Sequence, residues 1–122
     1  MKVIMIAGMH RSGTSLLASI LHNAGLFLGY DLMHGGFDNI KGHYEDLQIL
    51  AIHEYDLKLK KMHTNGLRIK NNKSLCFEEE TFKRIENLLT KRKNLNVWGW
   101  KEPRSTMYIH HWKKIVPSLK VI

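Results

Sequence analysis

The sequence has little cysteine, little proline and no long apolar run. Its single cysteine, Cys76, excludes an intramolecular disulfide framework, fits a reducing compartment and favours buried packing over nucleophilic chemistry. The only prolines, Pro103 and Pro117, are each expected to end an element. No stretch approaches the roughly 18 apolar residues of a membrane-spanning helix. We therefore expect a soluble, cytoplasmic protein with no membrane partner.

Acidic residues are also scarce. The 122 residues hold 11 Asp and Glu against 19 Lys and Arg, a net charge of +8, which favours an anionic partner. Charge alone fits nucleic acid, a membrane surface and a phosphorylated small molecule equally. The basic run at 91–93 follows a predicted helix that opens with glutamates at 78–80, so we interpret both runs as helix-end electrostatics and expect no nucleic-acid partner.

The residue that is most informative by its absence is a lysine at position 14. The stretch GMHRSGTSLL, residues 8–17, brackets four residues between two glycines, but Thr14 stands where a nucleoside triphosphatase loop has lysine. Kinase or ATPase chemistry loses the cation that it needs at the terminal phosphates. Arg11 can bind a phosphate instead, with hydroxyls from Ser12, Thr14 and Ser15, and the alternative is a purely structural turn.

Apolar patterning predicts an α/β fold over a single domain, 1–122. Strands are expected at 3–7, 97–101 and 119–122, with less definite strand and turn at 67–70 and 71–74. Helices are expected from Thr14 to Gly25, from near Glu45, over 78–93, and from Ser105 or Thr106 to Lys114. The first helix is expected to bury Leu16, Leu17, Ile20, Leu21 and Ala24, and the second Leu47, Leu50, Ala51, Tyr55, Leu59 and Met62. Strands that alternate with helices imply a parallel sheet, with ligands at the carboxyl ends of the strands.

Three stretches in this order resemble the sulfotransferase family that uses 3′-phosphoadenylyl sulfate (PAPS). RSGTS after a strand resembles the family's 5′-phosphosulfate loop. NIKGHYED at 39–46 resembles its acceptor-side segment, and WGWKEPRS at 98–105 resembles its lysine-containing K-D-P-R segment. The resemblance is closest to the bacterial and carbohydrate-type members. It implies a P-loop-like three-layer αβα fold around a central parallel sheet.

The resemblance also implies roles. Glu45 would be the general base, with His43 as the alternative, Lys101 would stabilise the departing phosphate oxygen, and Arg11 would hold the 5′-phosphate. The implied cofactor-binding set is His10, Arg11, Ser12, Gly13, Thr14, Ser15, Lys101 and Arg104. Arg104 could equally pair with Glu102 or Glu45. PAPS is the implied co-substrate, no metal is required, and no histidine spacing resembles a metal site. The tryptophans are expected in the core rather than under an adenine.

Two departures from the family pattern bear on this interpretation. Glu102 replaces the usual aspartate, and the chain ends at Ile122, where family members continue into the residues that hold the 3′-phosphate. We therefore expect the N-terminal portion of such a domain, with a sheet incomplete at its C-terminus and prone to self-association through an unpaired edge. The predicted function is sulfuryl transfer from PAPS to a hydroxyl of a carbohydrate or small metabolite. The alternatives are a non-catalytic phosphate- or nucleotide-binding module and a kinase without the usual lysine.

Overall fold

A computed structural model describes residues 2–8, 13–32, 44–64 and 74–122. Within these residues helices separate each strand from the next. In chain order they are β1 (Lys2–Ile6), α1 (Thr14–Asn23), α2 (Leu47–Leu59), α3 (Glu79–Arg92), β2 (Val97–Lys101), the 3-10 helix η1 (Pro103–Tyr108), α4 (Ile109–Ile115) and β3 (Leu119–Val121). The predicted strand and turn at 67–73 lie outside the described residues.

The strands described form one parallel sheet in the order β2-β1-β3, so β1 is central. Ile4 is paired with Gly99 on one side and with Lys120 on the other. The chain crosses from β1 to β2 and then back past β1 to β3, which makes the carboxyl end of β1 the point where the winding reverses. Open parallel sheets bind ligands at such a point. The predicted glycine loop begins there.

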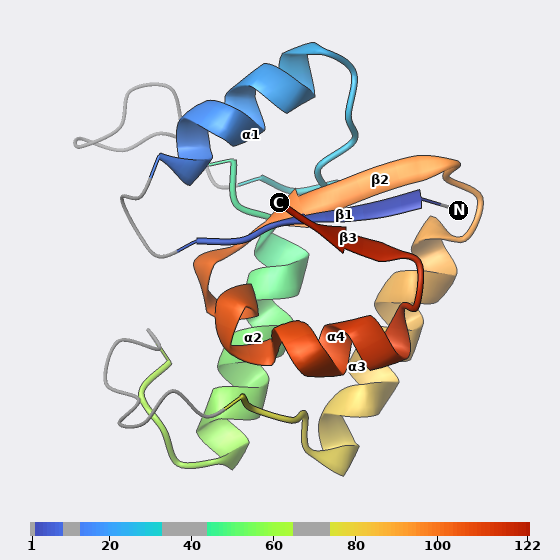
Figure 1. The fold of residues 1–122 in the computed structure, drawn as a ribbon. Helices are drawn as coiled ribbons and strands as arrows, with labels where there is room; N and C mark the ends of the chain where they lie inside the picture. Colours follow the sequence, from blue (N-terminus) through green and yellow to red (C-terminus); the bar gives the residue numbers. More distant parts are fainter. Residues whose placement is uncertain (1, 9–12, 33–43, 65–73) are drawn as a thin grey trace.

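Helices cover both faces of the sheet, with α1 on one face and α2, α3 and α4 on the other (Figure 1). The larger core lies on the α2 side and includes all three tryptophans, each fully buried, as expected from the sequence. The smaller core beneath α1 consists of Ile6, Ala18 and Leu28. The α/β class, the parallel sheet and the helices on its two faces agree with the prediction.

Gly99 allows the two longer strands to approach each other. A Cβ at this position would lie 2.4 Å from the carbonyl oxygen of Ile4 on the neighbouring strand, well inside van der Waals contact. The absence of a side chain at Gly99 therefore lets β2 pair closely with β1 and carries Lys101 to the end of β1.

The predicted buried faces of α1 and α2 are largely wrong. On α1, Leu16 is 68% and Ile20 56% exposed, whereas Thr14 and the small Ala18 face the sheet. On α2, the buried residues are Ile49, Ile52, His53, Asp56 and Leu57. Leu47, Leu50, Ala51 and Tyr55, which were expected inside, line an open groove on the outer side. Apolar residues occupy both faces of α2, and buried polar partners decide which face turns inward.

Asp56 is the centre of one such polar contact. Its fully buried carboxylate accepts hydrogen bonds from Tyr108 Oη, Thr81 Oγ1 and the Glu78 backbone N–H, each at 2.7 Å, and pairs with Lys60. Burial alone would raise the pKa of Asp56, but these donors together hold it below the ordinary value. The cluster joins α2, α3 and η1.

Cys76 is exposed, so the expected buried packing role is wrong. The last helix opens as the 3-10 segment η1, with Pro103 at its first position, where the missing N–H of proline costs no helical hydrogen bond. Among the described residues, no helix is both long and apolar enough to cross a membrane.

Candidate functional site

The site is built around the connection between β1 and α1. Gly13 immediately precedes α1 and has a φ of 88°, a left-handed conformation that favours glycine. Its carbonyl oxygen accepts the Leu17 N–H at 3.3 Å, so it begins the helical hydrogen bonding. The first N–H groups of α1 have no acceptor within the helix, and such a helix start favours an anion. Ser15 in this turn lies beside the end of β2, since its Oγ is 3.2 Å from Lys101 Nζ. His10, Arg11 and Ser12, predicted to contribute to this loop, lie outside the described residues, as does His43.

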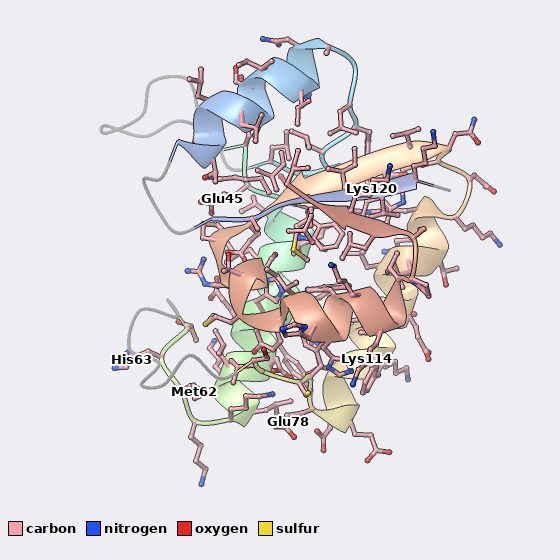
Figure 2. All side chains as sticks on the ribbon, in the orientation of Figure 1. Glu45, Met62, His63, Glu78, Lys114 and Lys120 are labelled. Atoms are coloured by element: carbon pink, nitrogen blue, oxygen red, sulfur yellow. The ribbon has the colours of Figure 1, made fainter. Side chains whose placement is uncertain are left out.

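Lys101 extends into this region from the end of β2. Its side chain is on the α1 side of the sheet, because strand residues alternate and Trp100 faces the opposite core. Lys101 Nζ donates to Ser15 Oγ at 3.2 Å and to Glu45 Oε1 at 3.4 Å. Three residues predicted from separate motifs thus meet at one point. Figure 2 shows Glu45 at this end of the sheet, close to the start of α1.

The ammonium of Lys101 is nearly inaccessible, with the residue 3% exposed, and Glu45 is 4% exposed. Burial lowers the pKa of Lys101 below its ordinary value, and the negative charges of Glu45 and Glu102 offset part of that effect. Lys101 therefore loses its proton more easily than a lysine in water. While it is protonated, a cation held by fixed partners in a region that largely excludes water suits the stabilisation of charge that develops during a reaction.

The segment that carries Glu45 is hydrogen-bonded to the end of β2. The backbone N–H of Asp46 donates to the carbonyl oxygen of Lys101 at 3.1 Å, and the N–H of Leu47 donates to the carbonyl oxygen of Asp31 at 2.9 Å. The residue before Glu45, Tyr44, has a φ of 56°, so the chain turns sharply there. These bonds fix the position of Glu45 relative to Lys101 through the backbone as well as through their side chains.

Asp46 caps α2 and holds a buried cation. Its Oδ1 accepts from Gln48 N–H at 3.0 Å and Ile49 N–H at 3.3 Å, the contacts of an N-cap aspartate. Its Oδ2 lies 2.8 Å from Nη1 of Arg92, an ion pair whose angles are not those of a hydrogen bond. Burial raises the pKa of Asp46, and the Arg92 guanidinium offsets this only in part. Arg92, which the sequence assigned to the basic end of its helix, is in the last turn of α3 and is also fully buried against Asp46.

Arg104 is held by a neighbouring carboxylate and by a backbone carbonyl oxygen from beyond the end of α2. Its Nη1 lies 2.6 Å from Oε1 of Glu102, and its Nε donates to the carbonyl oxygen of Thr64 at 2.5 Å. Of the alternatives left open by the sequence, the structure places Arg104 against Glu102. Its predicted contact with the nucleotide would require the side chain to leave these partners.

Sequence reasoning missed two polar residues at the site. Thr106 Oγ1 accepts the Gly8 N–H at 3.2 Å and joins η1 to the start of the loop, although Thr106 was expected only as a helix cap. Asp46 could have been found, since an aspartate before an apolar helix is a common N-cap. No local pattern in the sequence would identify the contact of Thr106, because its partner is 98 positions away.

Comparisons with known proteins do not assign this site. No protein-family model, no curated protein and no solved structure matches the chain. The chemistry of the residues themselves must therefore carry any functional inference.

Proposed function

We propose that this chain is a sulfotransferase of P-loop-like fold. It transfers the sulfuryl group of PAPS to a hydroxyl of a carbohydrate or small metabolite. The observation that carries the proposal is the meeting of Lys101 with Ser15 and Glu45 at the carboxyl end of the sheet, beside the first turn of α1. A cation, a hydroxyl and a carboxylate at an anion-binding helix start are the groups that sulfuryl transfer requires.

The phosphosulfate end of PAPS occupies the loop between β1 and α1. The first-turn N–H groups of α1 and the positive end of its dipole attract the 5′-phosphate. Arg11, inside the loop sequence, contributes a planar cation that can bind two phosphate oxygens. With Thr14 at the position of the usual lysine, positive charge comes from Arg11 and from Lys101 on the neighbouring strand.

Lys101 acts on the leaving group. In the transfer, a bond forms between the acceptor oxygen and sulfur, and the bond between sulfur and the bridging phosphate oxygen breaks. The electron pair of the broken bond stays on that oxygen, which becomes part of the 5′-phosphate of 3′-phosphoadenosine 5′-phosphate (PAP). Lys101 Nζ, held by Ser15 Oγ, neutralises this developing charge in a region from which water is largely excluded.

Glu45 removes the proton of the acceptor hydroxyl. Its carboxylate lies 3.4 Å from the Lys101 ammonium, so the base is adjacent to the cation that stabilises the leaving group. A non-catalytic phosphate-binding module would need no base beside that cation. The pairing therefore favours the enzyme over the binding module.

Transfer of radiolabelled sulfate tests this proposal. The purified chain is incubated with labelled PAPS and a set of hydroxyl acceptors, and both labelled product and PAP are measured. The proposal expects acceptor-dependent formation of PAP and of a sulfated product in equal amounts, without added metal. Consumption of PAPS that is identical in Lys101→Met and Glu45→Gln variants would contradict it, since neither residue would then take part.

A further inference from the structure

The side chain after Lys101 begins a buried polar chain on the opposite side of the sheet. Successive strand residues project to opposite faces, so Glu102 points toward α2 and α4, whereas Lys101 points toward α1. Glu102 is fully buried, with Oε2 2.6 Å from Nδ1 of His53 and Oε1 2.6 Å from Nη1 of Arg104. Both carboxylate oxygens are therefore used.

The hydrogen bond from Trp112 determines the protonation of His53. Trp112 Nε1 lies 3.0 Å from His53 Nε2, and an indole N–H can only donate. His53 Nε2 is then the acceptor, which leaves its proton on Nδ1, where it is donated to Glu102. His53 is neutral, and Arg104 is the formal counter-ion of Glu102. Burial alone would raise the pKa of Glu102, but the His53 hydrogen bond and the Arg104 charge hold it below the ordinary value.

This chain of contacts ties the end of β2 to three other segments. His53 belongs to α2, Trp112 to α4, and Arg104 reaches the carbonyl oxygen of Thr64 beyond the end of α2. The carbonyl oxygen of Lys101 also accepts the Asp46 N–H, one residue after Glu45. Any movement of the backbone at 101–102 would therefore displace both Lys101 and the segment that carries Glu45.

We propose that Glu102, oriented by His53, is a positioning residue for Lys101. It anchors the carboxyl end of β2 from the far side of the sheet, so that Lys101 Nζ is presented to Ser15, Glu45 and the anion site. Buried polar networks are poor sources of stability compared with apolar packing, but a fully satisfied one specifies a single geometry. The catalytic role of Lys101 rests on the proposed function. The position in which Glu102 holds the Lys101 side chain does not depend on that function.

The test compares three variants of the network. His53→Leu removes the donor to Glu102, His53→Asn keeps an amide N–H near the position of Nδ1, and Glu102→Gln removes the charge. Thr81→Val is the matched control: Thr81, on α3, donates a buried hydrogen bond to Asp56 of α2, in the same core but outside the polar chain. The free energy of unfolding of each variant is measured in urea.

The first measurement is the rate at which an amine-selective reagent modifies Lys101 in the folded protein, followed by mass spectrometry. We expect His53→Leu and Glu102→Gln to raise this rate about tenfold, the order of effect of losing one buried hydrogen bond to a charged group. His53→Asn should restore a rate close to that of the parent. Thr81→Val should leave the rate unchanged at a similar loss of stability. Rates that rise in proportion to lost stability in all variants, the control included, would overturn the proposal.

The second measurement separates this proposal from the proposed function. In the sulfuryl transfer assay, His53→Leu should lower kcat by about 10²-fold, as expected for a small displacement of a catalytic group, with a smaller change in the KM for PAPS. An unchanged kcat in His53→Leu would overturn the positioning role in catalysis. If the parent transfers no sulfate while the Lys101 modification rates follow the expected pattern, the positioning role of Glu102 stands and the sulfotransferase assignment fails.

Discussion

Nζ of Lys101 lies 3.4 Å from Oε1 of Glu45, although 56 positions separate the two residues in the chain. The pair joins the end of β2 to the segment before α2, and Ser15 at the start of α1 completes it. Opposite charges held together at an anion-binding helix start are costly to bury and add little stability by themselves. The proposed sulfuryl transfer would use such a pair, because it needs a cation and a base at the same place.

Replacing Lys101 with methionine tests the cation. Methionine keeps much of the side-chain length but loses the charge, so we expect kcat for sulfuryl transfer to fall about 10²- to 10³-fold at saturating PAPS. The matched control is Lys120→Met, which removes an exposed lysine from β3 and should leave kcat within a factor of about two. Equal effects of the two substitutions would point to overall charge rather than to the site.

Replacing Glu45 with glutamine tests the base. The amide cannot accept the proton, so we expect kcat to fall about 10²- to 10⁴-fold while the affinity for PAP changes little. The same assay on His43→Gln compares the alternative base suggested by the sequence. Loss of activity in His43→Gln together with normal activity in Glu45→Gln would transfer the role to His43.

The lowered pKa of Lys101 predicts how binding depends on pH. Lysine is charged below its pKa, and burial sets that pKa below the ordinary 10.5, so PAP affinity should fall as pH rises while other lysines stay charged. In Glu45→Gln the decline should begin at lower pH, since a negative charge that holds the proton has been removed. In Lys101→Arg the decline in PAP affinity with rising pH should disappear, because arginine stays protonated. Titration calorimetry between about pH 7 and 10 measures this, and identical profiles in the parent and Lys101→Arg would exclude Lys101 as the cause.

The buried pair of Asp46 and Arg92 predicts a stability effect that is not additive. Arg92→Met leaves the Asp46 carboxylate buried without its cation, which should cost about 3 to 5 kcal/mol of unfolding free energy. Arg92→Met combined with Asp46→Asn should cost less than the sum of the single substitutions, because asparagine keeps the cap without a charge. Urea unfolding of the parent, both single variants and the double variant gives the coupling. Strictly additive losses would mean that the pair contributes no interaction.

Local signals in the sequence predicted most of the elements. The run VWGWK with Pro103 two residues later marks β2, and Gly25, with a φ of 103°, follows the end of α1 as expected. Apolar spacing failed on α2, since that helix is apolar on two sides and its inner face is set by the partners of His53 and Asp56. Periodicity records where apolar residues recur and carries no information on distant polar partners.

In the candidate site, too, the residues could be predicted from the sequence but the contacts that hold them could not. Ser15, Glu45 and Lys101 were each predicted from short motifs, and the fold brings them together. The bonds that hold them were not predictable, because Glu102 and His53 are 49 positions apart and each resembles an ordinary charged or polar residue in its own segment. Only the crossover from α2 to β2 places those two side chains in contact.

The most direct test of the central claim is calorimetric titration of the chain with PAP, repeated with ATP and magnesium and with an Arg11→Ala variant. The sulfotransferase assignment predicts one PAP per chain, bound in preference to magnesium ATP, with affinity that falls sharply in Arg11→Ala. Preference for magnesium ATP would favour the kinase alternative. PAP binding that is unaffected by Arg11→Ala would contradict the assignment of the loop between β1 and α1 as the phosphate site.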